Sequence, residues 1–269
     1  MGRKINSNLL KKNKYDKWSF NYLVKKKEET SFFFFKNYVI YQMFQKLFFK
    51  YQLYILDCKI YQTPFLIHIF ISYSNLKIKK LINPNKIETS LFINKILLIL
   101  NNYIKYKLNF YIILQNLIKY FIQLKLFLNY SNIKKTIYTR YKKYEIKYKF
   151  IKSLLKIFIL TITKSNSAQF LSNYISYLCK IKIHRKHHLR FLKLFKTITS
   201  KLINSKVSIV SGIKIILSGR LNGFSRSRSR FITINNMPLN SYNVKISYGS
   251  SISYTINGTL GIKVWIYEK

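Results

Sequence analysis

The residues of this sequence best suited to a chemical task are arginines spaced two apart, in the segment SRSRSR at residues 225–230. In an extended strand every second side chain points to the same face, so Arg226, Arg228 and Arg230 would stand about 6.8 Å apart on one side. Guanidinium groups hold phosphate through paired, charge-assisted hydrogen bonds. The spacing therefore predicts a row of contacts to neighbouring phosphates of a nucleic acid. The alternative is a disordered Arg/Ser tract open to phosphorylation.

A second candidate contact lies just before the arginine row, in the segment SGRLNG at residues 218–223. Gly219 and Gly223 flank Arg220, and glycine permits a positive φ and a close approach of the backbone to a partner. A turn of this kind suits a loop laid against RNA. The alternative is an ordinary hairpin loop that carries an exposed arginine.

Acidic residues are too few and too scattered for most catalytic chemistry. The chain has 49 Lys and Arg residues against 7 Asp and Glu, and no carboxylate lies between Glu145 and Glu268. Two-metal nucleases and general acid–base sites need carboxylates placed together. The phosphate-cradling GxxxxGK[ST] loop is missing too. We therefore expect no enzymatic activity, no catalytic residue and no cofactor.

The histidines and cysteines do not form a convincing metal site. His184 and His188 lie one helical turn apart, which is the spacing of a metal pair. The nearest further ligands are His187, on another face, and Cys179. Cys58 and Cys179 stand alone, without the spacing of a disulfide or zinc framework. We expect the histidines to pack or to touch RNA, and we expect no metal.

The charge balance predicts a polyanionic partner. The formal net charge is +42, and a folded monomer with that surplus repels itself unless a polyanion offsets it. The two candidates are nucleic acid and an anionic membrane surface. A spanning helix needs roughly 20 mostly apolar residues, whereas lysines such as Lys95, Lys105 and Lys119 interrupt the apolar stretches here. We expect nucleic acid as the partner and no membrane span.

Four zones can be separated along the chain: a basic and aromatic segment at 1–50, a strand-rich zone at 51–130 with a Lys-rich helical pattern from Leu91, a Lys/Tyr-rich insertion or connector at 131–164, and a C-terminal domain at 165–269. In the first zone, FFFF at 32–35 predicts a buried or partner-covered surface, because an exposed patch of that size would aggregate. In the second zone, IHIFI at 67–71 predicts a strand.

The last zone predicts two amphipathic helices followed by strands. Apolar residues recur at three- and four-residue spacing: they are Phe170, Leu171, Tyr174, Ile175 and Leu178 in the first helix, and Phe191, Phe195, Ile198 and Leu202 in the second. Asn166 and Gln169 would cap the first helix. Beyond about residue 206 the apolar period becomes two, at Val207 and Ile209, at Ile213, Ile215 and Leu217, and at Ile262, Val264 and Ile266. This order indicates an α+β domain, with two helices packed on one face of a mixed β-sheet.

Two segments, SGRLNG at 218–223 and GIKVWIY at 261–267, together resemble the C-terminal domain of the universal small-subunit ribosomal protein three family. That family typically reads SGRLGG and then GVIGVKVWIF. Pro238 and Leu239 fall on the family's Pro-Leu pair, while Asn235 stands where the family has a glycine. The resemblance covers residues 166–267, and the opening MGRKIN is similar to the family's usual start.

The resemblance implies a KH-like α/β domain before the C-terminal domain. A KH domain clamps single-stranded nucleic acid with a GxxG turn between its helices. Residues 51–130 contain no such turn, so we expect a degenerate KH-like domain that has lost its clamping loop. The GxxG at 258–261 falls in the expected final strand pair and is a chance match.

The resemblance also implies a structural role in the head of the small ribosomal subunit. The rRNA contacts would be made by Arg220, Arg226, Arg228, Arg230 and Lys263. A basic helix face would line the channel through which mRNA enters, and its residues are Arg185, Lys186, Arg190 and Lys193. The neighbours would be proteins of the tenth and fourteenth small-subunit families and organelle-specific ribosomal proteins.

Two other functions compete with this hypothesis. A free organellar RNA-binding factor, active in splicing or RNA maturation, would share the same basic surfaces. An intron-encoded nuclease is disfavoured by the missing carboxylates. Permanent association with the small subunit separates the ribosomal protein from the free factor.

The composition points to an organelle. Asn, Ile, Lys, Tyr and Phe are heavily used and Ala168 is the only alanine, a bias towards A/T-rich codons that is typical of mitochondria, plastids and some reduced bacteria. The N-terminal segment has neither an amphipathic Arg/Ser-rich presequence nor the apolar core of a signal peptide, as expected of a chain made inside the organelle. We expect the ribosome of the mitochondrial matrix, with the plastid as the alternative.

Overall fold

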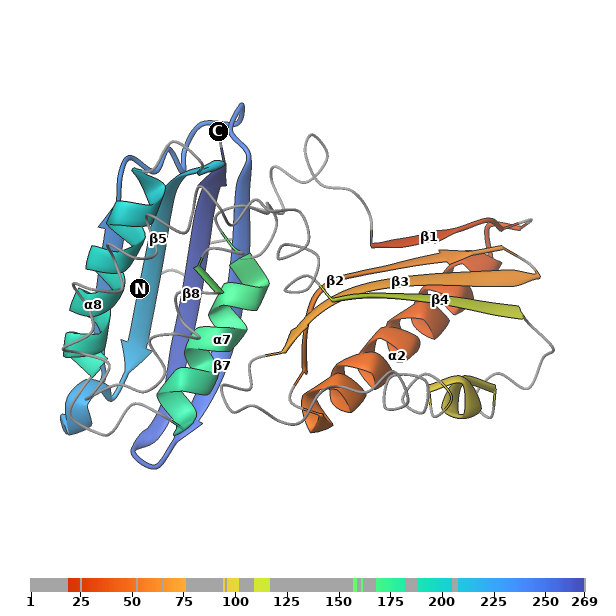
Figure 1. Ribbon diagram of the computed structural model, residues 1–269, viewed down its shortest axis with the longest axis horizontal. Helices are drawn as coiled ribbons and strands as arrows, with labels where there is room; N and C mark the ends of the chain where they lie inside the picture. Colours follow the sequence, from red (N-terminus) through yellow and green to blue (C-terminus); the bar gives the residue numbers. More distant parts are fainter. Residues whose placement is uncertain are drawn as a thin grey trace. The chain divides into compact units, whose positions relative to one another are not determined.

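The computed structural model describes residues 19–24, 26–51, 53–63, 65–75, 94, 96–101, 109–116, 157–158, 161, 168–181, 188–204 and 208–268. The described residues up to 116 form one compact unit, the N-terminal unit, and those from 157 onward belong to a second, the C-terminal unit (Figure 1). Most of the expected insertion at 131–164 lies outside the described residues.

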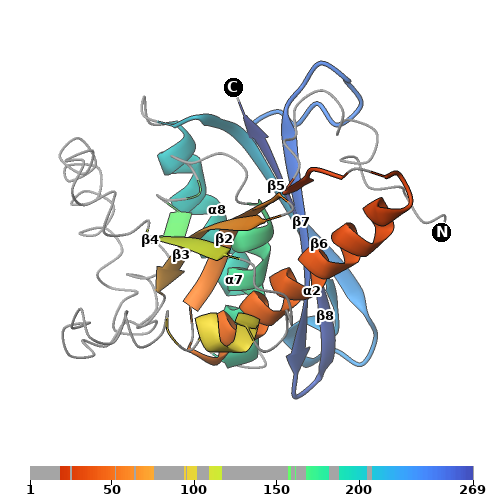
Figure 2. The ribbon, with the colours of Figure 1, turned by 90° about the vertical axis from the view of Figure 1, so that its right-hand side faces the viewer.

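In the N-terminal unit one long helix, α2 (Glu29–Lys50), packs on a four-stranded sheet (Figure 2). The sheet order is β1 (Phe20–Tyr22), β2 (Leu53–Gln62), β3 (Leu66–Asn75) and β4 (Asn109–Asn116). Strands β2 and β3 form an antiparallel pair, while β1–β2 and β3–β4 are parallel. A parallel neighbour requires a crossover, and the segment between β3 and β4 includes the short helical stretch 96–101.

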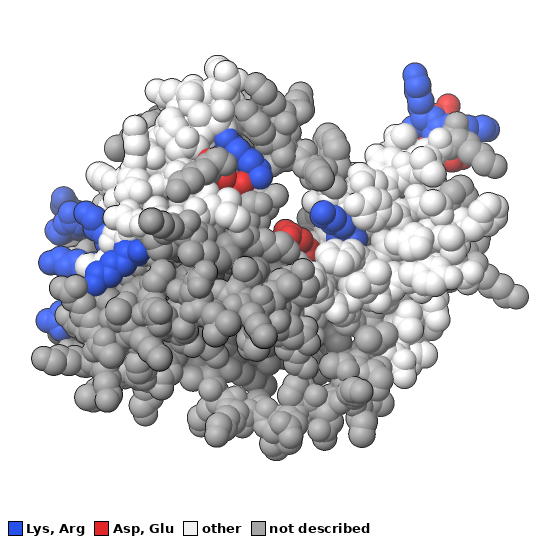
Figure 3. Space-filling view, turned by 45° about the horizontal axis from the view of Figure 1, so that its top comes forward, with Lys and Arg blue, Asp and Glu red and all other residues white. Residues whose placement is uncertain are grey.

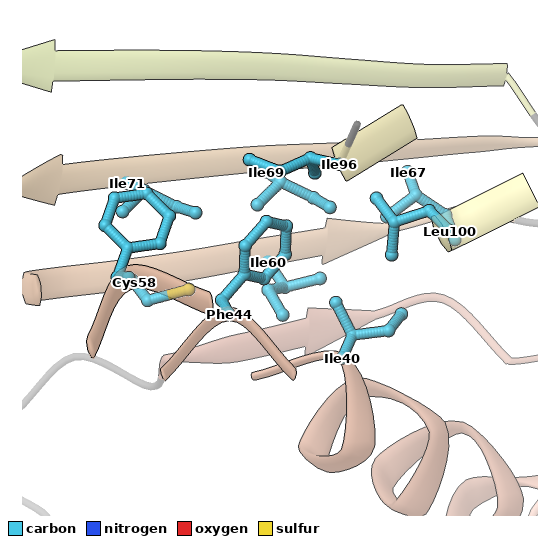
Figure 4. Packing of buried hydrophobic residues seen from close by; sticks show 10 residues of the cluster. Ile40, Phe44, Cys58, Ile60, Ile67, Ile69, Ile71, Ile96 and Leu100 are labelled. Atoms are coloured by element: carbon cyan, nitrogen blue, oxygen red, sulfur yellow. The ribbon is translucent and has the colours of Figure 1, made fainter. Parts of the chain in front are cut away.

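The core of this unit lies between the apolar face of α2 and the face of the sheet that α2 covers. The buried face of α2 repeats every three or four residues, at Asn37, Ile40, Phe44 and Phe48. It meets alternate residues of β2 and β3, and Ile96 and Leu100 close the same cluster (Figure 4). Each fully buried apolar side chain of this size stabilises the fold by roughly 1.5–3 kcal/mol.

Two expectations for the first zone need correction. The expected boundary at residue 50 does not separate the described elements, because α2 shares one core with the strands that follow it. The phenylalanine run is not buried within the chain, since Phe32 and Phe35 are 62% and 63% exposed. Phe33 stacks on Tyr22, and Phe34 meets Phe20 edge-on. Cover by a partner stays a prediction for this run.

The strand predicted at 67–71 is confirmed and forms part of β3. The mixture of helix and strand expected over 51–130 is present in the described residues of that zone. Its KH-like identity stays a prediction. The sequence contains no glycine between Gly2 and Gly212, so a GxxG turn cannot occur in this zone. The GxxG at 258–261 opens a strand of the C-terminal unit, as expected of a chance match.

The C-terminal unit has the expected α+β class. Helices α7 (Ala168–Ile181) and α8 (His188–Ile203) precede β5 (Val210–Gly219), a 3-10 turn η1 (Leu221–Gly223), β6 (Arg228–Ile234), β7 (Ile246–Thr255) and β8 (Gly258–Glu268). The sheet order is β6-β5-β8-β7, and every pair is antiparallel. The sequence pattern predicts a mixed sheet, and that detail is wrong. Both helices cover the same face of the sheet (Figure 1), with α7 over β7 and β8 and α8 over β5 and β6.

The apolar stripes predicted for both helices are buried against this sheet. One predicted strand position is wrong. Ile209 is exposed and precedes β5, because the strand begins at Val210 with a bulge that shifts its register before Gly212. The buried alternation then runs through Ile213, Ile215 and Leu217, as predicted.

Small and polar residues hold α7 close to β7. The hydroxyl groups of Ser251 and Ser253 donate to backbone carbonyls of α7, at Ser172 and Ser176, over 2.7 and 2.9 Å. The Gln169 amide forms two hydrogen bonds with the Ser250 backbone, at 2.8 and 3.1 Å. Gln169 therefore docks the helix on the sheet edge, and Asn166, its expected capping partner, lies outside the described residues.

Gly249 is the position where this approach is tightest, because a Cβ there would overlap the backbone of Ala168 and Gln169. We predict that Gly249→Ala lowers the free energy of unfolding by about 1–3 kcal/mol, the usual cost of overpacking. Urea unfolding would be followed by Trp265 fluorescence in a Trp18→Phe background. Ser250→Ala is the matched control, since its bonds to Gln169 use only backbone atoms. A Gly249→Ala midpoint equal to that of the control would contradict the tight contact.

Candidate nucleic-acid interface

The SGRLNG segment forms a sharp loop at the end of β5. Gly219 and Gly223 both have positive φ, at 133° and 80°, which is the conformational freedom that the sequence predicted for them. A Cβ at Gly219 would also overlap the carbonyl oxygen of Thr259 and the side chain of Leu260. The loop therefore turns directly against the start of β8.

This loop is tied to the beginning of α8 by two hydrogen bonds. The backbone N–H of Asn222 donates to His188 Nδ1 over 3.1 Å, and Asn222 Oδ1 accepts from the Leu189 N–H over 3.4 Å. Leu189 is in the first turn of the helix, where backbone N–H groups have no partner within the helix. Asn222 thus caps α8 from a distant part of the sequence, and the nitrogen of His188 that accepts the bond carries no proton.

Phe224 arranges two of the arginines at the same end of the sheet. Its carbonyl oxygen accepts a hydrogen bond from Arg220 Nε over 3.1 Å. Its ring lies 4.2 Å from the guanidinium carbon of Arg228, within the range of a cation–π contact. Both arginines are exposed. Phe224 therefore contacts both guanidinium groups, and each keeps N–H donors for an anion.

Only two of the three arginines of the row lie on a strand. Strand β6 begins at Arg228, so Arg228 and Arg230 share one face while Arg226 lies in the preceding loop. Arg230 pairs with Leu217 and therefore points to the helix-covered side of the sheet. Ile232 and Ile234, further along that face, are buried. The arginines stand where the helix layer has ended, and all three are exposed.

The basic helix face predicted from the sequence lies on α8. Arg190 and Lys193 are exposed on it. Arg185 and Lys186, together with His184 and His187, lie outside the described residues. Arg190 is two residues from His188, which is bonded to the η1 loop. The structure therefore brings the first turn of the basic helix and the Arg220 loop to the same end of the unit, although they are about 30 residues apart in sequence.

Lys263 does not belong to this group. It is exposed on β8 and pairs with Ile216 of β5, and both point to the sheet face opposite the helices. We call the set of Arg190, Lys193, Arg220, Arg226, Arg228 and Arg230 the basic end.

The electrostatic character of the basic end follows from the lack of acidic residues nearby in sequence. None occurs between Glu145 and Glu268, and Glu268 itself is buried in an ion pair with Lys245. Figure 3 shows blue side chains gathered along the margin of the C-terminal unit where α8 lies in Figure 1. Uncompensated cations in a group of this kind attract polyanions.

The groups that could perform other chemistry are inactive or dispersed in the described part of the chain. Burial raises the pKa of the Cys179 thiol to about 12. Burial, with a smaller effect of the Asp57 charge, raises the pKa of Cys58 to about 12, so neither thiol is a nucleophile at neutral pH. Within the described ranges no three His, Cys, Asp or Glu residues gather as a metal site would require, and no helix is long and apolar enough to cross a membrane.

Sequence reasoning missed Phe224 and Asn222. Phe224 directly follows the loop and precedes the arginine row, and an aromatic ring between basic segments is a signal that could have been used. Asn222 could have been found as a residue that tolerates positive φ and often caps helices. The helix that it caps could not be deduced from spacing.

Comparison with known proteins agrees with this architecture. Residues 182–266 match the sequence model of the family described as "Ribosomal protein S3, C-terminal domain". The matched residues include α8 and nearly all of the sheet that carries the basic end, and the family is described as structural and non-enzymatic.

Similar proteins carry the same family name. The chain is 36% identical over 78 residues to small ribosomal subunit protein uS3c of Euglena gracilis, covering 29% of this chain and 34% of that protein. It is 40% identical over 76 residues to uS3c of Chara vulgaris, covering 28% and 35%. It is 46% identical over 59 residues to uS3 of Corynebacterium aurimucosum, covering 22% and 24%. The alignments span about a third or less of these relatives, so the similarity to the ribosomal protein S3 family is confined to part of the chain.

The Asn222 contact can be tested by separating its two roles. Asn222→Ala should lower the free energy of unfolding by about 2 kcal/mol, with about half from the left-handed backbone and half from the lost cap. Asn222→Gly keeps the backbone freedom and should show only the cap loss. Both variants would be compared by urea unfolding in the Trp18→Phe background. Equal stability of the alanine variant and the parent would rule out the cap.

Proposed function

We propose that this chain is a structural constituent of the small ribosomal subunit and binds small-subunit rRNA through the basic end. The similarity of residues 182–266 to the ribosomal protein S3 family supports a ribosomal role. The observation that carries the rRNA contact is the joining of the Arg220 loop to the start of α8 by His188 and Asn222. That junction places basic side chains from a helix, a loop and a strand together, with no acidic residue in the intervening sequence.

A more specific part of the proposal concerns contact with mRNA. We propose that the exposed face of α8, with Arg190 and Lys193, lines the path of incoming mRNA in the head of the subunit. In this hypothesis the Arg220 loop and β6 hold rRNA phosphates while the solvent face of α8 stays available for a second strand. Arg185 and Lys186 would extend the same face. Proteins of the tenth and fourteenth small-subunit families would be the neighbours, together with organelle-specific ribosomal proteins.

The compartment that we propose is an organelle, and the comparisons favour the plastid over the mitochondrion that the composition suggested. The relatives from Euglena gracilis and Chara vulgaris carry the chloroplast-type name uS3c. The A/T-rich codon bias fits either organelle.

Stable association with the small subunit separates a ribosomal protein from a free RNA-binding factor. We expect the full chain to sediment with small subunits, and to remain with them when magnesium depletion dissociates the two subunits. Lysates of the source organelle would be fractionated on gradients with and without magnesium, and the chain detected by mass spectrometry. A chain found mainly in ribosome-free fractions at intact-ribosome magnesium would favour the splicing or maturation factor.

The arginine row should act through phosphate contacts. Each neutralised phosphate changes the slope of log K against log salt concentration by about 0.7–0.9. The triple variant Arg226→Ala, Arg228→Ala, Arg230→Ala should therefore flatten the slope by roughly two to three units. Binding of the full chain to small-subunit rRNA would be titrated over a salt series, with circular dichroism as the folding control.

A matched control separates local contacts from net charge. Lys26→Ala, Lys46→Ala, Lys50→Ala removes the same three charges from the N-terminal unit. If the arginine variant and the lysine variant lower the slope equally, the effect comes from net charge and the proposed phosphate row is wrong.

A further inference from the structure

A second surface of the C-terminal unit lies on the sheet face that α7 and α8 leave uncovered (Figure 1). Its middle is a row of three paired residues on neighbouring strands, Lys214 of β5, Trp265 of β8 and Tyr248 of β7. The Lys214 Nζ lies 5.7 Å from the Trp265 ring centroid, and the Tyr248 and Trp265 rings are 5.2 Å apart. A lysine and two aromatic rings therefore lie side by side across the centre of the sheet.

The next row extends this pattern towards the edge strand. Phe231 of β6 pairs with Ile216, which pairs with Lys263 of β8. Phe231 is 69% exposed, and Tyr254, near the end of β7, is 67% exposed. We call the set of Lys214, Phe231, Tyr248, Tyr254, Lys263 and Trp265 the aromatic face. All of these side chains point to one side of the sheet, because paired residues of an antiparallel ladder share a face.

We propose that the aromatic face is a stacking platform for unpaired nucleotides of a single-stranded RNA. Bases of any sequence stack on aromatic rings, and lysines between the rings neutralise the phosphates. A protein partner would have to remove Lys214 and Lys263 from water and supply carboxylates for them, because the aromatic face has no acidic member. A double helix could not present its bases to the rings, since they are stacked and paired inside it.

Continuity with the basic end adds support. Strand β6 is an edge strand, and its successive residues point to opposite sides of the sheet. Arg228 and Arg230 belong to the basic end, whereas Phe231 belongs to the aromatic face. An RNA strand that crosses this edge would thus contact the basic end through its phosphates and, a few nucleotides further on, the aromatic face through its bases. The proposal rests on the proposed function in naming RNA, but it assigns a different surface and a different kind of contact.

The test uses the full chain with Trp18→Phe, which leaves Trp265 as the only tryptophan. The probes are a 12-nucleotide oligo(U) and a 12-base-pair RNA duplex. We expect oligo(U) to quench Trp265 fluorescence and the duplex to leave it unchanged. Phe231→Ala and Tyr254→Ala should each weaken oligo(U) binding about tenfold. The salt slope should stay that of the parent, because no phosphate contact has been removed.

Ile252→Ala is the matched control, because Ile252 is 60% exposed on the same face but has no ring. Phe231→Leu keeps an apolar side chain at the edge and should still lose affinity, which separates stacking from general hydrophobicity. The proposal is overturned if the aromatic variants bind oligo(U) like the Ile252 control, or if duplex and single strand quench alike.

The outcomes also distinguish this proposal from the proposed function. If the arginine variant flattens the salt slope while the aromatic variants bind as the parent does, the aromatic face is wrong and the basic end stands. If the parent binds neither rRNA nor oligo(U), both fail. If oligo(U) leaves Trp265 unchanged while proteins extracted from small subunits quench it, the surface docks a protein instead.

Discussion

The C-terminal unit is held together mainly by uncharged contacts, because the sequence between Glu145 and Glu268 contains no acidic residue to balance its cations. Among the described residues, Lys245, which directly precedes β7, forms an ion pair with Glu268 at the end of β8. Elsewhere, buried rings such as Phe191 and Phe195 provide the apolar contact between helix and sheet. Neutral hydrogen bonds from serine and glutamine to backbone groups then fix α7 in place. This arrangement leaves the exposed cations available for an external polyanion, and a polyanion would relieve their mutual repulsion.

Asparagine replaces glycine at two turns, and the structure gives the physical reason why the fold tolerates it. The family pattern has glycine at the positions of Asn222 and Asn235, and these are the two non-glycine residues with positive φ in the described ranges, both at 56°. Asparagine is the side chain that best accepts this conformation, because its short amide bonds to nearby backbone. Asn235 donates to the Ser211 carbonyl over 3.0 Å, and Asn222 caps α8. A codon bias towards A and T favours asparagine over glycine, and at both turns the asparagine amide forms a hydrogen bond that glycine has no side chain to form.

The sequence predicted the elements with strong apolar periods and missed those held by other forces. Both helices and the strand positions around Ile215 and Val264 follow from apolar stripes, because a stripe at the period of a helix or strand marks the face that is buried. Strand β7 has no such stripe, since its covered face consists of Ser247, Gly249, Ser251 and Ser253. Its small side chains fit only because α7 approaches closely there, and that closeness is a tertiary property. The residues of the basic end could be named from composition and spacing, but the contact between Asn222 and α8 joins segments whose proximity no local pattern encodes.

The two edges of the C-terminal sheet show how one fold both avoids aggregation and presents a surface. An edge strand with free backbone groups can pair with another sheet unless charge or a cover prevents it. On β7 the Gln169 amide bonds the Ser250 N–H and C=O, and so occupies a place where a neighbouring strand would pair. On β6 the exposed side chains of Arg228 and Arg230 oppose the approach of a second copy, which would carry the same charges. The same arginines attract phosphate, so the residues that keep β6 unpaired with protein are those that suit this edge to RNA.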